Sequence, residues 1–148
     1  MRGDFPPELS AGYLVRDAHR AFQHELEKRI ARYGVTRGQW YFLRVLWIED
    51  GLSQRELSER VGMMEPTTVI ALRGMEKAGL VVRERSRRER RKALVWLTAK
   101  GKRLRDRLLP VARGIVEDAE NGVPEAELRV FRRVIAQLRK NLDRLRER

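Results

Sequence analysis

The first half of the chain carries hydrophobic residues at helical spacing and predicts four helices. Apolar side chains recur every three or four positions, so each segment can bury one face. Residues that cap helix starts, and glycines that favour helix ends, separate the segments. Two starts carry a capping box, in which Thr36 is followed by Gln39 and Ser53 by Glu56. The expected helices cover residues 10–33, 36–50, 53–62 and 65–78.

After Gly79 the pattern changes and predicts two short strands. Residues 80–82 and 93–97 are rich in β-branched and aromatic side chains, which favour strands. The segment between them, residues 83–92, contains seven basic and two acidic residues. We therefore expect a β-hairpin whose connecting segment is strongly basic.

Two long helices are predicted for the rest of the chain. Thr98 can cap the first, which is expected to bend at Pro110 and to end at Asn121-Gly122. The second begins near Pro124 and carries an apolar seam with alternating spacings of three and four, typical of a coiled coil. Such a narrow seam favours a partner helix in a dimer over packing within the same chain. Its members are Leu128, Phe131, Ile135, Leu138, Leu142 and Leu145.

Composition and charge narrow the class of protein. The 148 residues include 33 Lys and Arg against 21 Asp and Glu, so a polyanion is the expected partner, with nucleic acid ahead of an anionic membrane. The absence of cysteine excludes disulfides and thiol chemistry. No apolar stretch is long enough to span a membrane and the start does not resemble a signal peptide, so we expect a cytoplasmic protein.

The order of the predicted elements is that of a winged helix-turn-helix. A short capped helix, a glycine turn and a second helix precede the basic hairpin, which stands where a wing would lie. We expect a mainly α fold with a small β-hairpin wing, residues 65–78 entering the major groove of DNA and residues 83–92 lying in or along the minor groove. The alternatives are an architectural DNA-binding protein with little sequence preference, and a protein-interaction module that uses the C-terminal seam.

Side chains in three places are candidate DNA contacts. The first residues of helix 65–78 would meet base edges, although Thr67 and Thr68 could instead satisfy the helix start. The start of helix 53–62 is suited to a backbone phosphate. In the wing, Arg87, Arg88 and Arg90 are the candidates for insertion into the minor groove. The full set is Ser53, Gln54, Arg55, Pro66, Thr67, Thr68, Arg73, Arg85, Arg87, Arg88, Arg90 and Arg91.

Taken together, these segments resemble the MarR-type family of transcriptional regulators over roughly residues 9–145. The resemblance implies a homodimer in which residues 1–34 and 99–148 form a helical dimerisation region and residues 35–98 form the DNA-binding region. It also implies a repressor that binds a pseudo-palindromic operator and is released by a small aromatic ligand. The residues that carry it are Gly12-Tyr13-Leu14, Gln39-Trp40, 52–62 (LSQRELSERVG), 75–81 (MEKAGLV), 89–91 (ERR) and 94–101 (LVWLTAKG).

Two places depart from the family pattern. Ser86 and Glu89 stand where the wing usually carries Asp, which puts the usual Asp–Arg brace of the wing tip in question. Val69 and Ile70 stand where a polar residue and Arg are common. Fewer side chains of this helix can then hydrogen-bond to bases, so we expect readout to depend more on the wing and on DNA shape.

Other kinds of chemistry are not indicated. His19 and His24 are five residues apart, so they point in different directions on a helix, and no third residue has the spacing of a metal ligand. No catalytic triad or phosphate-binding glycine loop is recognisable, so we expect no enzyme, metal or cofactor. An aromatic effector could contact aromatic and basic side chains of the first two helices, unless the tryptophans belong to the core. The candidates are Tyr13, Arg16, His19, Trp40 and Trp47.

Overall fold

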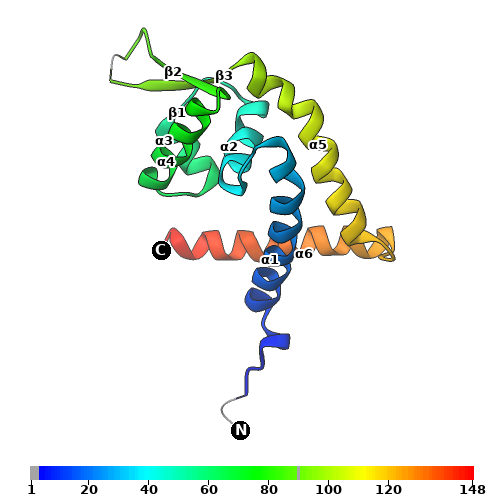
Figure 1. Ribbon diagram of the computed structural model, residues 1–148. Coiled ribbons are helices and arrows are strands. Elements are labelled where there is room, and N and C mark those ends of the chain that lie inside the picture. Colours follow the sequence, from blue (N-terminus) through cyan, green and yellow to red (C-terminus); the bar gives the residue numbers. More distant parts are fainter. Residues whose placement is uncertain (1–3, 90) are drawn as a thin grey trace. The chain divides into compact units, whose positions relative to one another are not determined.

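The predicted capping residues begin the helices of the computed structural model, which describes residues 4–89 and 91–148 (Figure 1). The Ser10 hydroxyl accepts a hydrogen bond from the backbone N–H of Tyr13, and the capping boxes at Thr36 and Ser53 are both complete. All four predicted helices are confirmed. They are α1 (Ala11–Ile30), α2 (Arg37–Ile48), α3 (Gln54–Val61) and α4 (Glu65–Lys77), with short 3₁₀ turns η1 (Pro7–Leu9) before α1 and η2 (Ala31–Tyr33) after it.

Three short strands form one antiparallel sheet, in the order β1–β3–β2. The predicted hairpin is confirmed as β2 (Val81–Arg85) and β3 (Ala93–Leu97). The strand β1 (Leu52–Ser53) was not predicted; its Leu52 lies opposite Val95 of β3. Two residues are too few to show the alternation of a strand, so only the pairing with β3 makes this segment one.

A hydrophobic core fixes the helices around the sheet. Its fully buried side chains come from α1 to α5 and from both strands of the hairpin. Burial of each such side chain stabilises the fold by about 1.5–3 kcal/mol. The wing therefore projects from a sheet that belongs to the core. The largest apolar side chains that are fully buried are Ile30, Phe42, Leu43, Leu46, Leu57, Leu72, Met75, Leu108, Val81 and Val95.

The chain divides into two units, Met1–Arg113 and Gly114–Arg148. The boundary falls within α5 (Ala99–Glu120), which begins after Thr98 and continues through Pro110. The second unit also contains α6 (Glu125–Arg146), all of whose residues are described and none of which is buried. The apolar seam of α6 is thus exposed or half-buried. Among the described residues, every helix is too short or too polar to cross a membrane.

Candidate nucleic-acid interface

The helices α3 and α4 form a helix-turn-helix whose turn starts at Gly62. This glycine has a φ of +75°, a left-handed conformation that costs glycine little, and its N–H donates to the carbonyl of Ser58 (2.9 Å). Leu57 of α3 and Leu72 and Met75 of α4 are fully buried. Hydrophobic packing therefore fixes which face of α4 points outward.

Thr68, which was predicted to contact DNA, lies inside the protein. Its side chain is 0% exposed, and its hydroxyl lies 2.7 Å from the hydroxyl of Ser58 and 3.3 Å from the carbonyl oxygen of Met64. A buried hydroxyl is costly without hydrogen-bond partners, and these two groups supply them. The prediction for Thr68 is therefore wrong, since this residue joins α3 to α4 and has no surface to offer to DNA.

The outward face of α4 carries the other predicted contacts of this helix. Pro66, Thr67 and Arg73 are exposed. Lys77 shares this face, and so does Ile70, whose side chain is 71% exposed. Neither of these two was among the predicted contacts. The helical period could have revealed them, because both lie opposite the buried positions of the helix.

At the start of α3 one predicted contact is buried and two are accessible. Ser53 is 4% exposed and its hydroxyl accepts the backbone N–H three residues later (3.1 Å), so its side chain caps α3 and offers little surface to DNA. The half-buried Gln54 accepts a hydrogen bond from Arg83 through its side-chain oxygen (3.2 Å). Arg55 is exposed and forms an ion pair with Glu59 (3.3 Å). Exposed pairs of this kind are weak, so Arg55 can exchange Glu59 for a phosphate.

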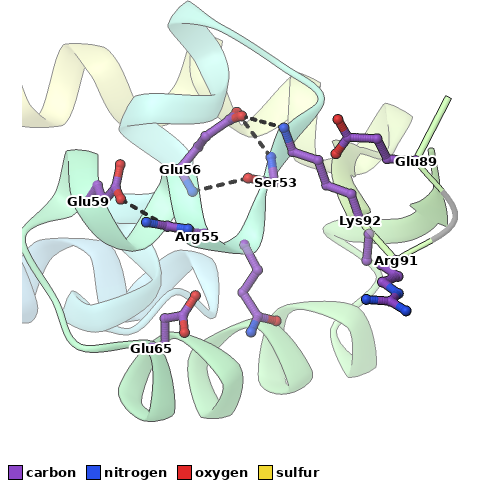
Figure 2. Close-up of a pocket in the computed structure, with 10 residues that line it drawn as sticks. Ser53, Arg55, Glu56, Glu59, Glu65, Glu89, Arg91 and Lys92 are labelled. Carbon is purple, nitrogen blue, oxygen red and sulfur yellow. Dashed lines mark hydrogen bonds and ion pairs between the residues drawn. The ribbon is translucent and has the colours of Figure 1, made fainter.

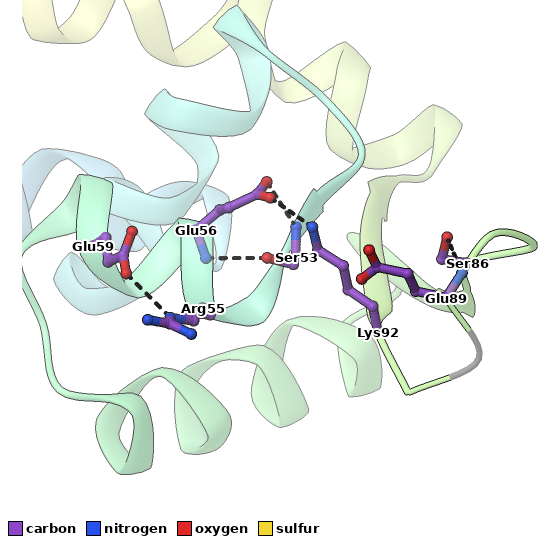
Figure 3. Close-up of polar contacts among 7 residues, drawn as sticks. All are labelled: Ser53, Arg55, Glu56, Glu59, Ser86, Glu89 and Lys92. Carbon is purple, nitrogen blue, oxygen red and sulfur yellow. Dashed lines mark hydrogen bonds and ion pairs between the residues drawn. The ribbon is translucent and has the colours of Figure 1, made fainter.

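Ser86 organises the tip of the wing. Its hydroxyl accepts hydrogen bonds from the backbone N–H groups of Arg88 (3.2 Å) and Glu89 (3.3 Å), the latter drawn in Figure 3. Its own N–H donates to the carbonyl of Lys92 across the hairpin (2.8 Å). A serine hydroxyl accepts backbone N–H groups in turns as an aspartate carboxylate does. The turn is therefore braced although the family's usual Asp is missing.

The predicted wing arginines project from this braced turn. Arg85, Arg87, Arg88 and Arg91 are all exposed. Arg90, which was predicted together with them, lies outside the described residues. Exposed guanidinium groups on an ordered turn can pair with phosphates or enter a narrow minor groove.

Two ion pairs join the wing to the helices. The ammonium of Lys92 lies 3.0 Å from the carboxylate of Glu56 in α3 (Figure 3), and Arg83 pairs with Glu76 in α4. The hydrogen bond from Lys92, and next that from the backbone of Ser53, lower the pKa of Glu56, while Glu56 raises the pKa of Lys92. Both groups are therefore charged at neutral pH. Neither pair was predicted from the sequence, because the partners are not neighbours along one element.

A hollow of about 640 Å³ lies between the start of α3 and the end of the wing (Figure 2). Its lining includes three basic residues and four glutamates, Glu56, Glu59, Glu65 and Glu89. Over residues 4–89 and 91–148, no group of three acidic or histidine side chains is placed to hold a metal ion. Two of these carboxylates pair with basic residues of the same lining, Glu56 with Lys92 and Glu59 with Arg55, so the hollow is a surface of mixed charge.

The five candidate effector contacts have different environments. Tyr13, Arg16 and His19 are exposed on α1. Trp40 is only 4% exposed and packs edge-to-face on Trp47, with 5.8 Å between the ring centroids. The half-buried Trp47 donates its indole N–H to the carbonyl of Gly101 (2.9 Å), which joins α2 to α5. Trp40 therefore belongs to the core and Trp47 already serves the fold through its polar atom, while a role of either in an effector site stays a prediction.

Comparisons with known proteins relate this chain to one group. The sequence profile of the MarR family matches residues 33–92. The HTH-type transcriptional regulator TtmR of Methylorubrum extorquens (strain PA1) is 32% identical over 96 residues, which are 65% of this chain and 49% of TtmR. The chain thus spans about half the length of that relative.

Solved structures extend the similarity to most of the chain. A MarR transcriptional regulator from Methanosarcina mazei Go1 has a TM-score of 0.84 and 28% identity, over 90% of this chain and 96% of that one. CouR bound to a 23-mer DNA duplex has a TM-score of 0.80 and 24% identity, over 88% and 93% of the two chains. CouR from Rhodococcus jostii RHA1 bound to p-coumaroyl-CoA has a TM-score of 0.79 and 20% identity, over 91% and 95%. Both CouR structures share the fold of this chain.

Proposed function

Because the chain belongs to the MarR family of winged helix-turn-helix transcriptional regulators, we propose that it represses transcription as a homodimer bound to a pseudo-palindromic operator. In each subunit α4 enters the major groove and the wing lies in or along the minor groove. The solved complex of CouR with a DNA duplex, which has the same fold, supports DNA binding by a protein of this architecture.

The observation that carries the proposal is the proximity of the basic wing to α4. Arg83 at the base of the wing pairs with Glu76 of α4, so the two elements belong to one surface. The wing carries Arg85, Arg87, Arg88 and Arg91 in exposed positions beyond that pair. Guanidinium groups fit phosphate oxygens in a bidentate manner, and each phosphate neutralised releases bound counterions from DNA. The exposed arginines are therefore suited to a polyanion that also meets α4.

The titration of DNA at several salt concentrations tests the proposal. Duplexes selected by the full-length protein from a random pool are compared with scrambled duplexes of equal length. We expect the selected duplex to bind ~10³-fold or more tightly than the scrambled one at matched salt. A ratio near one would reject the regulator and favour the architectural alternative.

A wing variant separates DNA binding from a protein-interaction role. For Arg87→Ala/Arg88→Ala we expect weaker binding and a salt dependence whose log–log slope falls by about 0.9 for each phosphate that the variant no longer neutralises. Arg37→Ala/Arg44→Ala removes the same charge from exposed positions of α2, outside the proposed dimer region and the proposed DNA contacts, and serves as the control. Unchanged DNA affinity in the wing variant, with the fold intact, would favour the protein-interaction module.

The proposed dimer uses residues 1–34 and 99–148, and its main support is the seam of α6. Phe131, Leu138, Leu142 and Leu145 are exposed in the single chain, and large exposed apolar patches commonly mark interfaces. We expect Leu138→Glu to separate the dimer, because a charge buried in the seam would lack a partner. Gln137→Glu adds the same charge beside the seam and should stay dimeric on size-exclusion chromatography. A dimeric Leu138→Glu protein would contradict this interface.

A small aromatic effector is the last part of the proposal. The structure of CouR with p-coumaroyl-CoA shows that this fold accommodates a coenzyme A thioester with an aromatic acyl group in CouR. In this chain Tyr13, Arg16 and His19 are the accessible candidates for contacting one, since Trp40 is buried. Weakened binding to the selected duplex upon addition of an aromatic carboxylate would support this role, and unchanged binding across a panel of such acids would count against it.

A further inference from the structure

The centre of the outward face of α4 is occupied by an aliphatic side chain. Ile70 is 71% exposed, although it lies between Thr68 and Leu72, which are both fully buried. Successive residues of an α-helix are rotated by about 100°, so Ile70 projects almost directly away from both neighbours. Its position is therefore fixed by the same packing that holds the helix.

The surroundings of Ile70 are polar and basic. Pro66, Ile70, Arg73 and Lys77 are all exposed and follow one another at spacings of four, three and four, so they form one stripe along α4. Thr67 is exposed beside this stripe. A partner that binds here meets Pro66 at the start of the helix, the aliphatic Ile70 at its centre and cationic groups towards its end, which matches DNA better than an apolar protein surface.

The local fold offers no reason for an isoleucine at this position. An exposed side chain contributes little to the core, and β-branched residues are poorer helix formers than alanine or leucine. An aliphatic side chain cannot hydrogen-bond to a base edge. In the major groove it has one apolar counterpart, the C5-methyl group of thymine, which cytosine lacks.

We propose that Ile70 determines part of the sequence specificity by contacting a thymine methyl group in the major groove. This inference rests on the proposed function and names the base that α4 recognises. Arg73 and Lys77, further along the stripe, then contact phosphates and set the position of the helix.

Deoxyuridine substitution tests this contact, because it removes the methyl group and leaves base pairing unchanged. In a duplex selected by the full-length protein, each thymine is replaced in turn and the affinity of the protein is measured. We expect one or two positions per half-site at which the substitution weakens binding about 3- to 10-fold, as expected for the loss of one buried methyl group. Ile70→Ala should bind the thymine duplex more weakly than the unmodified protein does, by a similar factor. Replacing the contacted thymine by deoxyuridine should then weaken the binding of Ile70→Ala no further.

A control variant and three outcomes make the test decisive. Ile48→Ala removes the same atoms from a side chain that is 83% exposed at the end of α2, and it should respond to deoxyuridine as the unmodified protein does. Equal sensitivity of the unmodified protein and Ile70→Ala at every thymine would overturn the role of Ile70 and leave the proposed function standing. Loss of a protein partner by Ile70→Ala with unchanged DNA affinity would also overturn it. Failure to enrich any sequence would overturn the proposed function and this inference with it.

Discussion

The helix α4 and the wing, the two parts proposed to meet DNA, are held in place by different forces. In α4, Leu72 and Met75 are fully buried, and the one buried hydroxyl, that of Thr68, bonds to groups of the same helix-turn-helix. Beyond its strands, the wing depends on polar contacts, namely those of the Ser86 hydroxyl within the turn and the ion pair between Lys92 and Glu56 of α3.

This difference indicates how each part responds to its surroundings. Hydrophobic packing is insensitive to pH and to moderate salt, so the face that α4 presents should be constant. Exposed ion pairs are weakened by salt and replaced by other charges. We therefore expect binding of a polyanion to change the conformation of the wing more than that of α4. This difference agrees with α4 contacting bases and with the wing contacting phosphates or following the shape of the DNA.

The largest effect is expected from Leu72→Ala in the packed face of α4. The truncation leaves a cavity and should lower the free energy of unfolding by about 2–5 kcal/mol. Ile70→Ala, on the exposed face of the same helix, should change it by less than about 0.5 kcal/mol. Urea denaturation of both variants measures the difference. Similar losses in the two variants would contradict the assignment of inward and outward faces.

An intermediate effect is expected from Ser86→Ala at the wing tip. Loss of an acceptor for two backbone N–H groups should leave the global stability nearly unchanged but make the turn more mobile, because each such hydrogen bond contributes about 0.5–1.5 kcal/mol locally. NMR order parameters for the amides of Arg88 and Glu89 should fall, and DNA affinity should fall with them. Ser86→Asp restores an acceptor and should restore both properties. Unchanged order parameters in Ser86→Ala would show that the hydroxyl does not brace the turn.

The smallest effect is expected from Glu56→Gln, which keeps the capping position and removes the charge that pairs with Lys92. The pKa of Glu56 is lowered by this pair, so its contribution to stability is complete above the ordinary value of 4.5 and is lost as pH falls through the lowered pKa. The pKa of Lys92 is raised, so the pair persists below the ordinary value of 10.5 and is lost as pH rises through the raised pKa.

Denaturation of the unmodified protein and Glu56→Gln across a pH series measures this contribution. We expect a small, constant difference in stability between about pH 5 and pH 10, and a vanishing difference in acid. A difference that grows as pH falls below the ordinary value of 4.5 would contradict the assigned pair.

Most of the fold could be predicted from the sequence because its signals are local. A capping box needs residues only three positions apart, as at Thr36 and Ser53, and both boxes are complete in the structure. The hairpin was predicted from β-branched residues on either side of a basic segment. The strand β3 occupies the predicted residues, whereas β2 begins at Val81 and extends to Arg85, into the segment that was expected to connect the strands. The exposed arginines of the wing followed from the same segment, since long charged side chains stay in water.

Contacts between elements were decided only by the tertiary structure. From the sequence, the neighbours Thr67 and Thr68 were predicted to have the same role. Packing of α4 on α3, however, leaves Thr67 exposed and buries Thr68 against Ser58. The strand β1 and the pair of Lys92 with Glu56 likewise exist only because distant segments meet. Local periodicity determines which residues can form an element, whereas the inward direction of each side chain depends on what the rest of the chain places beside it.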